Sequence, residues 1–419
     1  MISNYEEFIN SINYKGINNK GSIYAQIIKG ERIKQNKTLE EVASGICSIS
    51  YLCKLENYMI YPPQNLVKQV FEKMNITYDD INEENLENIL DDSIVNFYSY
   101  DKEKLYDDYL KVKQFSSSPQ VVLLKCLYLL LMKDYDRVSK EVSFLDSIKD
   151  TLGGSESVLL ILVTILYYIG KRNYKKASLY LRCLDFLNID NKYIKYILYD
   201  ANLVSSFHLR NVGRFTDLYN KIDSYDYIGL SMSKRIVYRL MYDIIEYDDF
   251  PNQAVIDCDS IDLNEYMNND YYERLYYKYI IYINSKKYFE VFKDIIDNKY
   301  YDNIVFTGLL GVCAYFINQK EYYNKLIDVI NEIENIMCSK ENEYHKNFID
   351  LLLINFGNNK QQLRDFIKTD YYNNIAKCNN YFYDYIYNEI YINLLAVTHQ
   401  YKEAFYYLLN ITKIKINRQ

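Results

Sequence analysis

Apolar side chains recur at helical spacing along most of the chain, and residues that break helices are rare. From about residue 83 onward the apolar positions return every three or four residues, which is the period of one helix face. The 419 residues include only 12 Gly and 4 Pro, which favours helices joined by short turns over many short strands. The pattern therefore predicts an all-α protein, built as two or more units or as one extended array.

Residues 22–78 predict a compact cluster of four short helices. The first begins at Ile23, and apolar residues return along one face to about residue 33. The fourth follows the Pro62-Pro63 pair and covers residues 64–74. Two shorter helices lie between them, so the whole segment has the size of a small independent domain.

The two middle helices carry clear start and stop signals. Thr38 opens the second helix as a capping box, because Glu41 stands three residues later and can reach back to the helix start. Gly45 supplies a left-handed turn, and Ser48 caps a third helix over residues 49–56. Two short helices joined by a Gly-containing turn inside a helical cluster form the helix-turn-helix arrangement.

A helix-turn-helix enters the major groove of DNA with its second helix, whose N-terminal residues reach base edges. Its first helix and the residues before it contact the phosphate backbone. The residues predicted to bind DNA are Lys34, Lys37 and Thr38 at phosphates, with Ser48, Ile49, Ser50, Tyr51, Lys54 and Asn57 on or beside the second helix.

The string from Thr38 to Asn57 resembles the phage-repressor (XRE, Cro/C1-type) helix-turn-helix family. Most of the match lies in Gly45-Ile46, Ser50-Tyr51-Leu52 and Lys54-Leu55-Glu56-Asn57. The chain departs from that family at Leu39, where a phosphate-binding Gln is frequent, and at Tyr58, where Gly is usual. The alternative interpretation is a helical cluster that serves only as a protein-interaction module.

A second pattern runs through residues 101–419 and marks a repeat of helix pairs. A helix end is followed by small or polar residues, an aromatic residue and often an Ala three positions later. The aromatic residues stand at positions 135, 174, 215, 250, 288, 322 and 401, at intervals of 34 to 41 residues except the last. That last interval contains a degenerate copy at 355–360. The spacing predicts a tetratricopeptide-like superhelix, right-handed as in that repeat type, with a linker helix at 79–100 and an N-terminal arm at 1–21.

The repeat frame predicts a concave face that binds a small peptide. Asn amides carry both a donor and an acceptor for an extended backbone, and an Arg fork suits a carboxylate. Three Asn residues stand four positions before their aromatic anchors. The residues assigned to this face are Arg210, Asn211, Arg235, Tyr238, Tyr242, Asn284, Asn318, Asn355 and Asn393. The alternative is that Asn, which is abundant here, simply ends helices.

Charge and reactive residues narrow the class of protein. The chain carries a net charge of −7, but residues 22–76 carry +2, so the rest carries −9, which fits a DNA-binding head on an acidic body. Eight cysteines form no CxxC pair and three histidines lie far apart, which predicts reduced thiols in the cytoplasm and no metal site. No nucleotide-binding, metalloprotease or serine-hydrolase motif occurs, so neither an enzyme nor a cofactor is expected.

Membrane insertion is not expected either. The start of the chain lacks the features of a signal peptide, and the most apolar stretch, residues 158–169, is too short to span a bilayer.

A repressor-type head before a tetratricopeptide-like body resembles the peptide-pheromone-responsive (quorum-sensing) regulators of Gram-positive bacteria, the Rgg, PlcR, NprR and PrgX group. The resemblance implies a cytoplasmic homodimeric transcription regulator that binds a palindromic operator in double-stranded DNA. It also implies that a small signalling peptide binds the concave face and repositions the two heads. Two alternatives remain open: a Rap-like adaptor that binds a partner protein, with DNA binding secondary, and a phage-type lysis–lysogeny regulator.

Overall fold

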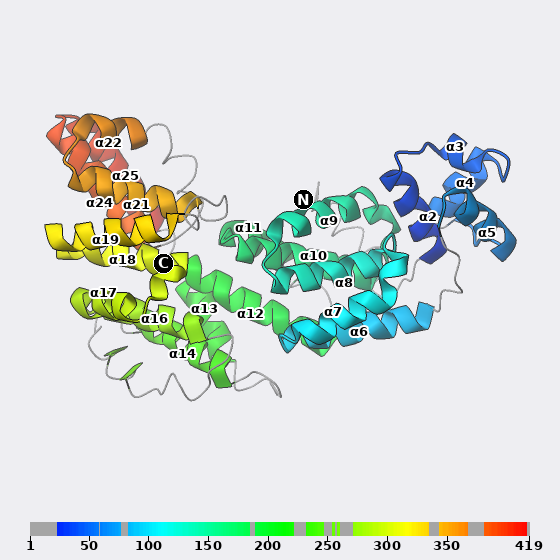
Figure 1. Ribbon diagram of the computed structural model, residues 1–419, viewed down its shortest axis with the longest axis horizontal. Coiled ribbons are helices and arrows are strands. Elements are labelled where there is room, and N and C mark those ends of the chain that lie inside the picture. The colour runs from blue at the N-terminus through cyan, green and yellow to red at the C-terminus, as the bar shows by residue number, and fades with distance from the viewer. Residues whose placement is uncertain are drawn as a thin grey trace. The chain divides into compact units, whose positions relative to one another are not determined.

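The structure is a computed structural model, which describes residues 23–57, 59–76, 83–184, 189–221, 232–246, 254–255, 258–259, 271–334, 343–367 and 381–416. These residues form α-helices and short 3-10 turns, and no strand occurs among them (Figure 1). The predicted all-α class is confirmed. The chain divides into two compact units, Met1–Asn202 and Leu203–Gln419, and each is considered by itself.

The first unit begins with the predicted four-helix head. Its helices are α2 (Ile23–Lys34), α3 (Leu39–Ala43), α4 (Ile49–Glu56) and α5 (Gln64–Lys73). The bounds of α2, α4 and α5 agree with the sequence-based bounds to within one residue, and α3 lies between the predicted cap at Thr38 and the predicted turn at Gly45. These ends have local causes such as a cap, a turn or a proline. Their apolar faces meet in one core, in which Ile28, Val42, Leu52, Leu55 and Phe71 are fully buried.

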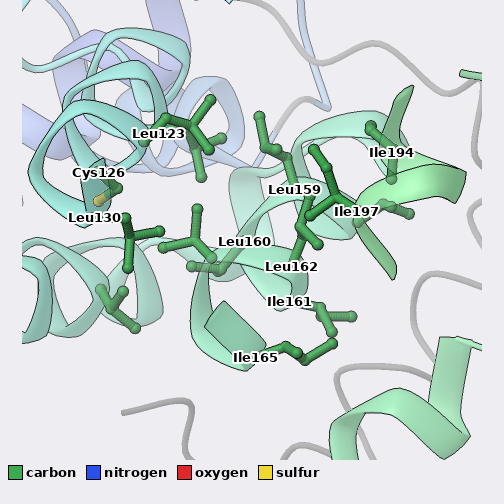
Figure 2. Close-up of a cluster of buried hydrophobic side chains, with 14 of the residues drawn as sticks. Leu123, Cys126, Leu130, Leu159, Leu160, Ile161, Leu162, Ile165, Ile194 and Ile197 are labelled. Carbon is green, nitrogen blue, oxygen red and sulfur yellow. The ribbon is translucent and has the colours of Figure 1, made fainter. Parts of the chain in front are cut away.

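Paired helices follow the head in the same unit. They are α6 (Glu83–Tyr98), α7 (Lys102–Val112), α8 (Pro119–Leu131), α9 (Tyr135–Ser147), α10 (Gly154–Gly170) and α11 (Tyr174–Leu184), and α12 (Lys192–His208) crosses into the second unit. The segment predicted as a linker helix is α6, which packs against both α7 and α8. Helices α8 and α10 are apolar almost all round, as helices enclosed by others must be. Figure 2 shows their side chains meeting, with Leu123 and Leu130 facing the Leu159–Leu162 stretch.

The second unit continues the helix pairs. Its described helices are α13 (Val212–Tyr219), α14 (Met232–Glu246), α16 (Tyr271–Asn284), α17 (Tyr288–Asp297), α18 (Ile304–Ile317), α19 (Lys320–Glu332), α21 (Glu343–Phe356), α22 (Lys360–Phe366), α24 (Tyr381–Val397) and α25 (Tyr401–Ile416). Helix α18 is enclosed by its neighbours and packs against α17, α19 and α21.

The turns within the helix pairs share one chemistry. A residue with positive φ ends the first helix, as at Lys133 (φ 58°), Arg172 (φ 54°) and Asn358 (φ 58°). The next residue commonly caps the second helix, as when Asp134 Oδ1 accepts from the Arg137 amide at 3.1 Å. This turn sets the predicted repeat, since four aromatic anchors, at positions 135, 174, 288 and 401, are the first residues of second helices. The anchor at position 250 lies outside the described residues.

In the second unit, a glycine of α18 lets this helix pack closely against side chains of α21 and α24. A Cβ at Gly308 would lie 1.7 Å from the Tyr383 hydroxyl and 3.1 Å from His345 Nδ1. The Tyr383 hydroxyl and His345 Nδ1 share a hydrogen bond of 2.7 Å, and the Tyr383 ring stacks on Phe348 at 3.7 Å between centroids. The buried ring of Tyr383 therefore occupies the space that any side chain at position 308 would need.

We expect Gly308→Ala to lower the free energy of unfolding by about 1–3 kcal/mol, because the methyl group forces apart three packed helices. Gly213→Ala is the matched control. It lies in helix α13, and nothing stands within 4 Å of the added Cβ. The control should raise stability by about 0.4–1 kcal/mol through the lower entropy of the unfolded chain. Urea denaturation followed by circular dichroism measures both values, and equal effects would contradict the packing argument.

One ion pair ties the helices of the head together. Arg32 on α2 donates from Nε and Nη2 to the two carboxylate oxygens of Glu56 on α4, both at 2.7 Å. Arg32 Nη1 also donates to the Lys37 carbonyl at 3.1 Å. Glu56 is 3 % exposed, and the hydrogen bonds to it raise the pKa of Arg32. The planar guanidinium thus fixes the end of α4 against α2 with a two-bond fork.

Removal of one partner should be costly, because it leaves the other charge buried and uncompensated. We expect Arg32→Met to lower the free energy of unfolding by about 3 kcal/mol. The double variant Arg32→Met with Glu56→Leu should recover most of that loss, since no buried charge remains. A double-mutant cycle from urea melts gives the coupling, and additive effects would show that the pair does not hold α4 in place.

Candidate nucleic-acid interface

The helix-turn-helix itself is built from local signals. The Thr38 hydroxyl accepts from the Glu41 amide at 3.2 Å, and the Glu41 carboxylate accepts from the Thr38 amide at 2.7 Å, so the predicted capping box is formed. That backbone hydrogen bond lowers the pKa of Glu41. Gly45 turns the chain with φ at +78°, and Ser48 Oγ accepts from the Tyr51 amide at 3.1 Å to start α4.

Helix α4 has one buried face and one exposed face. Leu52 and Leu55 are fully buried in the head core. Ile49 is 47 % exposed at the N-terminus of the helix, and Ser50 and Lys54 are exposed beside it. These are the positions that the sequence assigned to base contacts. An exposed apolar side chain can pack on a thymine methyl group, a hydroxyl can hydrogen-bond a base edge, and an ammonium group can bind a base edge or a phosphate.

The remaining predicted positions lie around this exposed face. Ser48 and Asn57 bracket α4 at its two ends, and both are exposed. Tyr51 is half-buried, and it packs against the head core rather than projecting freely. Asn57 donates from Nδ2 to the sulfur of Cys53 at 3.5 Å, so its amide is partly engaged within the helix. Lys37 is half-buried at the start of the turn before α3.

Lys34 contacts residues that lie outside the head. Its ammonium group donates to the Ser116 carbonyl at 2.8 Å and to Ser117 Oγ at 3.2 Å, and it stands 4.7 Å from the ring centre of Phe144. Burial lowers its pKa. Ser116 and Ser117 lie in the turn before α8 and Phe144 lies in α9, so all three are 82 or more residues away in sequence. The geometry therefore gives no support to Lys34 as a phosphate contact and makes it part of the junction between head and body.

The sequence-based prediction did not include two exposed residues that lie close to α4. Met59 and Tyr61 follow α4 and are 71 % and 75 % exposed. Both residues belong to the short apolar run before Pro62. This run fits neither the helical nor the strand period, and that irregularity was the feature of the sequence that could have indicated an exposed apolar segment. Lys73, at the end of α5, donates to the Ser44 carbonyl in the turn.

The predicted peptide-binding residues do not share one structural position. Asn211 Oδ1 caps α13 by accepting from the Arg214 amide at 3.3 Å, whereas Asn284 ends α16 and Asn318 adopts φ 52° after α18. Their equal spacing from an aromatic anchor fails as a guide because the anchors differ: Tyr288 begins its helix and Phe215 lies one turn inside. The structure therefore does not place these three Asn residues at one common position of the repeat.

The other residues predicted to bind a peptide differ in how deeply they are buried. Tyr238 is 1 % exposed, and Tyr242 stacks on Tyr219 at 4.4 Å between ring centroids, so both serve packing in this structure. Arg210 is the positive-φ residue of its turn. The rest are Arg235 and Asn355, which are half-buried, and Asn393, which is exposed.

Two further properties concern the described residues as a whole. They contain no group of three or more His, Cys, Asp or Glu side chains placed to hold a metal ion. None of the helices among them combines the length and the apolar character needed to cross a bilayer.

Comparison with known proteins gives little beyond this geometry. No protein-family profile and no curated protein matches the chain. Among solved structures, the chain is similar to PlcR of Bacillus thuringiensis in complex with the peptide PapR7 and DNA. That alignment covers 91 % of this chain and 98 % of PlcR at 14 % identity, with a TM-score of 0.15. Superposition is too poor at that score for the likeness to carry an argument.

Proposed function

We propose that the protein is a DNA-binding transcription regulator that reads DNA through α4. The observation that carries the proposal is the exposed face of α4, where Ile49 and Ser50 in the first turn and Lys54 in the last turn lie opposite the buried Leu52 and Leu55. The capping hydroxyl of Ser48 and the pair between Arg32 and Glu56 fix that helix at both ends. Recognition by a single helix requires this rigidity, because misplaced side chains lose base contacts.

In this proposal, the paired helices after the head form the domain that senses an effector. The head shares its core with α6, α7 and α8, which supply Leu86, Val112, Val121 and Leu124, and no described residue of that core lies beyond α8. The long array that follows α8 is therefore not needed to close the head core. In tetratricopeptide-like arrays, stacked helix pairs form extended surfaces that hold peptides. We infer a small signalling peptide as the effector and a cytoplasmic homodimer as the working form. One head covers only about 600–1,000 Å² of DNA, so paired heads on palindromic half-sites would raise affinity and selectivity.

The test uses the double variant Ser50→Ala with Lys54→Ala on a duplex selected by the wild-type protein from a random library. Each lost base contact costs about 1–3 kcal/mol, so we expect selective binding to fall by about tenfold or more. Binding to unselected duplex should fall much less, with a slightly shallower dependence on salt. Fluorescence anisotropy at several salt concentrations measures both quantities.

Gln69→Ala is the matched control, because Gln69 is an exposed polar residue of α5 in the same head. It should leave both affinities as they are. If the double variant keeps its selectivity, α4 is not the reading helix. If the wild-type protein enriches no duplex above background, the regulator proposal fails and the adaptor alternative becomes the better one.

A further inference from the structure

The head meets the paired helices through a buried polar junction. Gln26 of α2 is 1 % exposed, although it belongs to the head. Its Nε2 donates to the Thr151 carbonyl at 3.0 Å and to Glu156 Oε2 at 2.8 Å. Thr151 ends the 3-10 turn before α10, and Glu156 lies in the first turn of α10, so both partners are 125 or more residues away in sequence. A side-chain amide of the head is therefore built into the body as if it were one of its own residues.

Glu156 is the centre of this junction. Its Oε2 also accepts from the Gly153 amide at 2.8 Å, and its Oε1 accepts from Gln120 Nε2 on α8. Glu156 is 7 % exposed, and burial raises the pKa of its carboxyl to about 7 although these donors act in the opposite direction. The charged group that contributes from a neighbouring helix is Glu87 of α6, which raises the pKa further.

A second set of contacts flanks the junction. A Cβ at Gly30 of α2 would lie 2.9 Å from the Ser117 carbonyl and 3.2 Å from the Phe144 ring, so α2 approaches the body closely there. Lys34 bonds the Ser116 carbonyl, and Glu31 accepts from the Ser117 hydroxyl. Helix α8 contributes both kinds of contact. Val121 and Leu124 join the head core, and Gln120 Nε2 donates to Gln26 Oε1 at 3.4 Å on the polar side.

The two sides of this contact respond differently to conditions. The apolar side holds at any pH, because it contains no titrating group. The polar side is stable only while every buried group has its partner, and water can replace those partners if α2 moves away. The polar side also contains a titrating group, because burial raises the pKa of the Glu156 carboxyl to about 7.

We propose that Glu156, acting through Gln26, positions the head as a latch that is closed when the carboxyl is protonated and loosens when it ionises. Opening lets α2 swing on its apolar contact with α8. Glu156 is a positioning residue, since it touches no DNA in the proposed function. The inference rests on that function only in naming the positioned element as the DNA-binding head.

The direction of the pH effect follows from linkage. An exposed Glu titrates near pH 4.3, whereas Glu156 in the closed latch has a pKa of about 7. The closed state therefore binds the proton more tightly. The stabilisation of the closed state by this proton is complete when the pH is below the pKa of the exposed Glu. It falls as the pH rises from that pKa to the pKa of Glu156 in the closed latch, and it is lost at higher pH. Between pH 6 and pH 8 the ratio of closed to open molecules should fall by up to about tenfold.

The experiment exploits the absence of tryptophan from the chain. Phe144→Trp places one emitting residue beside Gly30 and below the Lys34 ammonium group. Its emission should move to longer wavelengths as α2 withdraws. Hydrogen exchange of residues 149–153 gives a second readout that needs no reporter, because these residues include the Thr151 carbonyl and the Gly153 amide of the junction.

In the reporter background, we expect the emission of the otherwise unchanged protein to shift between pH 6 and pH 8. Glu156→Gln should abolish that shift, since the amide does not titrate, and Gln26→Ala should show open-latch emission and faster exchange at both pH values. Glu41→Gln is the matched control. Glu41 holds the same capping position in α3, but its pKa is lowered, so the wild-type shift should persist.

The proposal is overturned if Glu156→Gln keeps the full pH profile, or if Gln26→Ala matches the wild-type emission and exchange at pH 6. Neither measurement uses DNA or peptide. Failure of the latch would therefore leave the DNA-binding proposal standing, and a protein that selects no DNA could still show the latch.

Discussion

Helix α2 packs on two sides, and the placement of the whole head depends on this double use. One side supplies Ile23, Ile27 and Ile28 to the head core. The other supplies Gln26, Gly30 and Lys34 to the paired helices. A residue substitution on one side of α2 is thus felt within the head, and one on the other side changes how the head is held. Within the first unit, the head packs against the helices that follow it and is held by these contacts as well as by the chain connection.

The parts of the fold that were predictable are those with local causes. The bounds of α4 follow from Ser48 and from the apolar positions 52 and 55, which lie within nine residues of one another. The period of the paired helices was visible because each turn needs a residue that tolerates positive φ and often an Asx cap after it. Such signals act over a few residues, so they can be read without knowledge of the partner helices.

The parts that escaped prediction depend on contacts between distant segments. Lys34 has the sequence context of a phosphate contact, and only the fold brings the Ser116 carbonyl to it. The register of the predicted peptide-binding residues could not be read from spacing for a related reason. Side-chain direction depends on the place of the anchor in its helix, and Tyr288 is the first residue of α17 whereas Phe215 lies one turn inside α13. Glu156 precedes an apolar stretch of α10. From the sequence alone, a carboxylate at position N3 of a helix looks like an ordinary capping residue. The burial of Glu156 comes from Gln26 and Gln120, which no local pattern connects to it.

The contrast between the two kinds of junction in the first unit has a physical consequence. Leu123 and Leu159 join α8 and α10 through apolar surface, which gives a contact that has no alternative partner in water. The contact of α2 with α10 uses amides and a carboxyl, for which water is a competent substitute. A polar contact of this type contributes little net stability while it fixes geometry closely. A protein that must hold a DNA-reading helix in one orientation, and also change that orientation, needs a contact with those two properties at the base of the head.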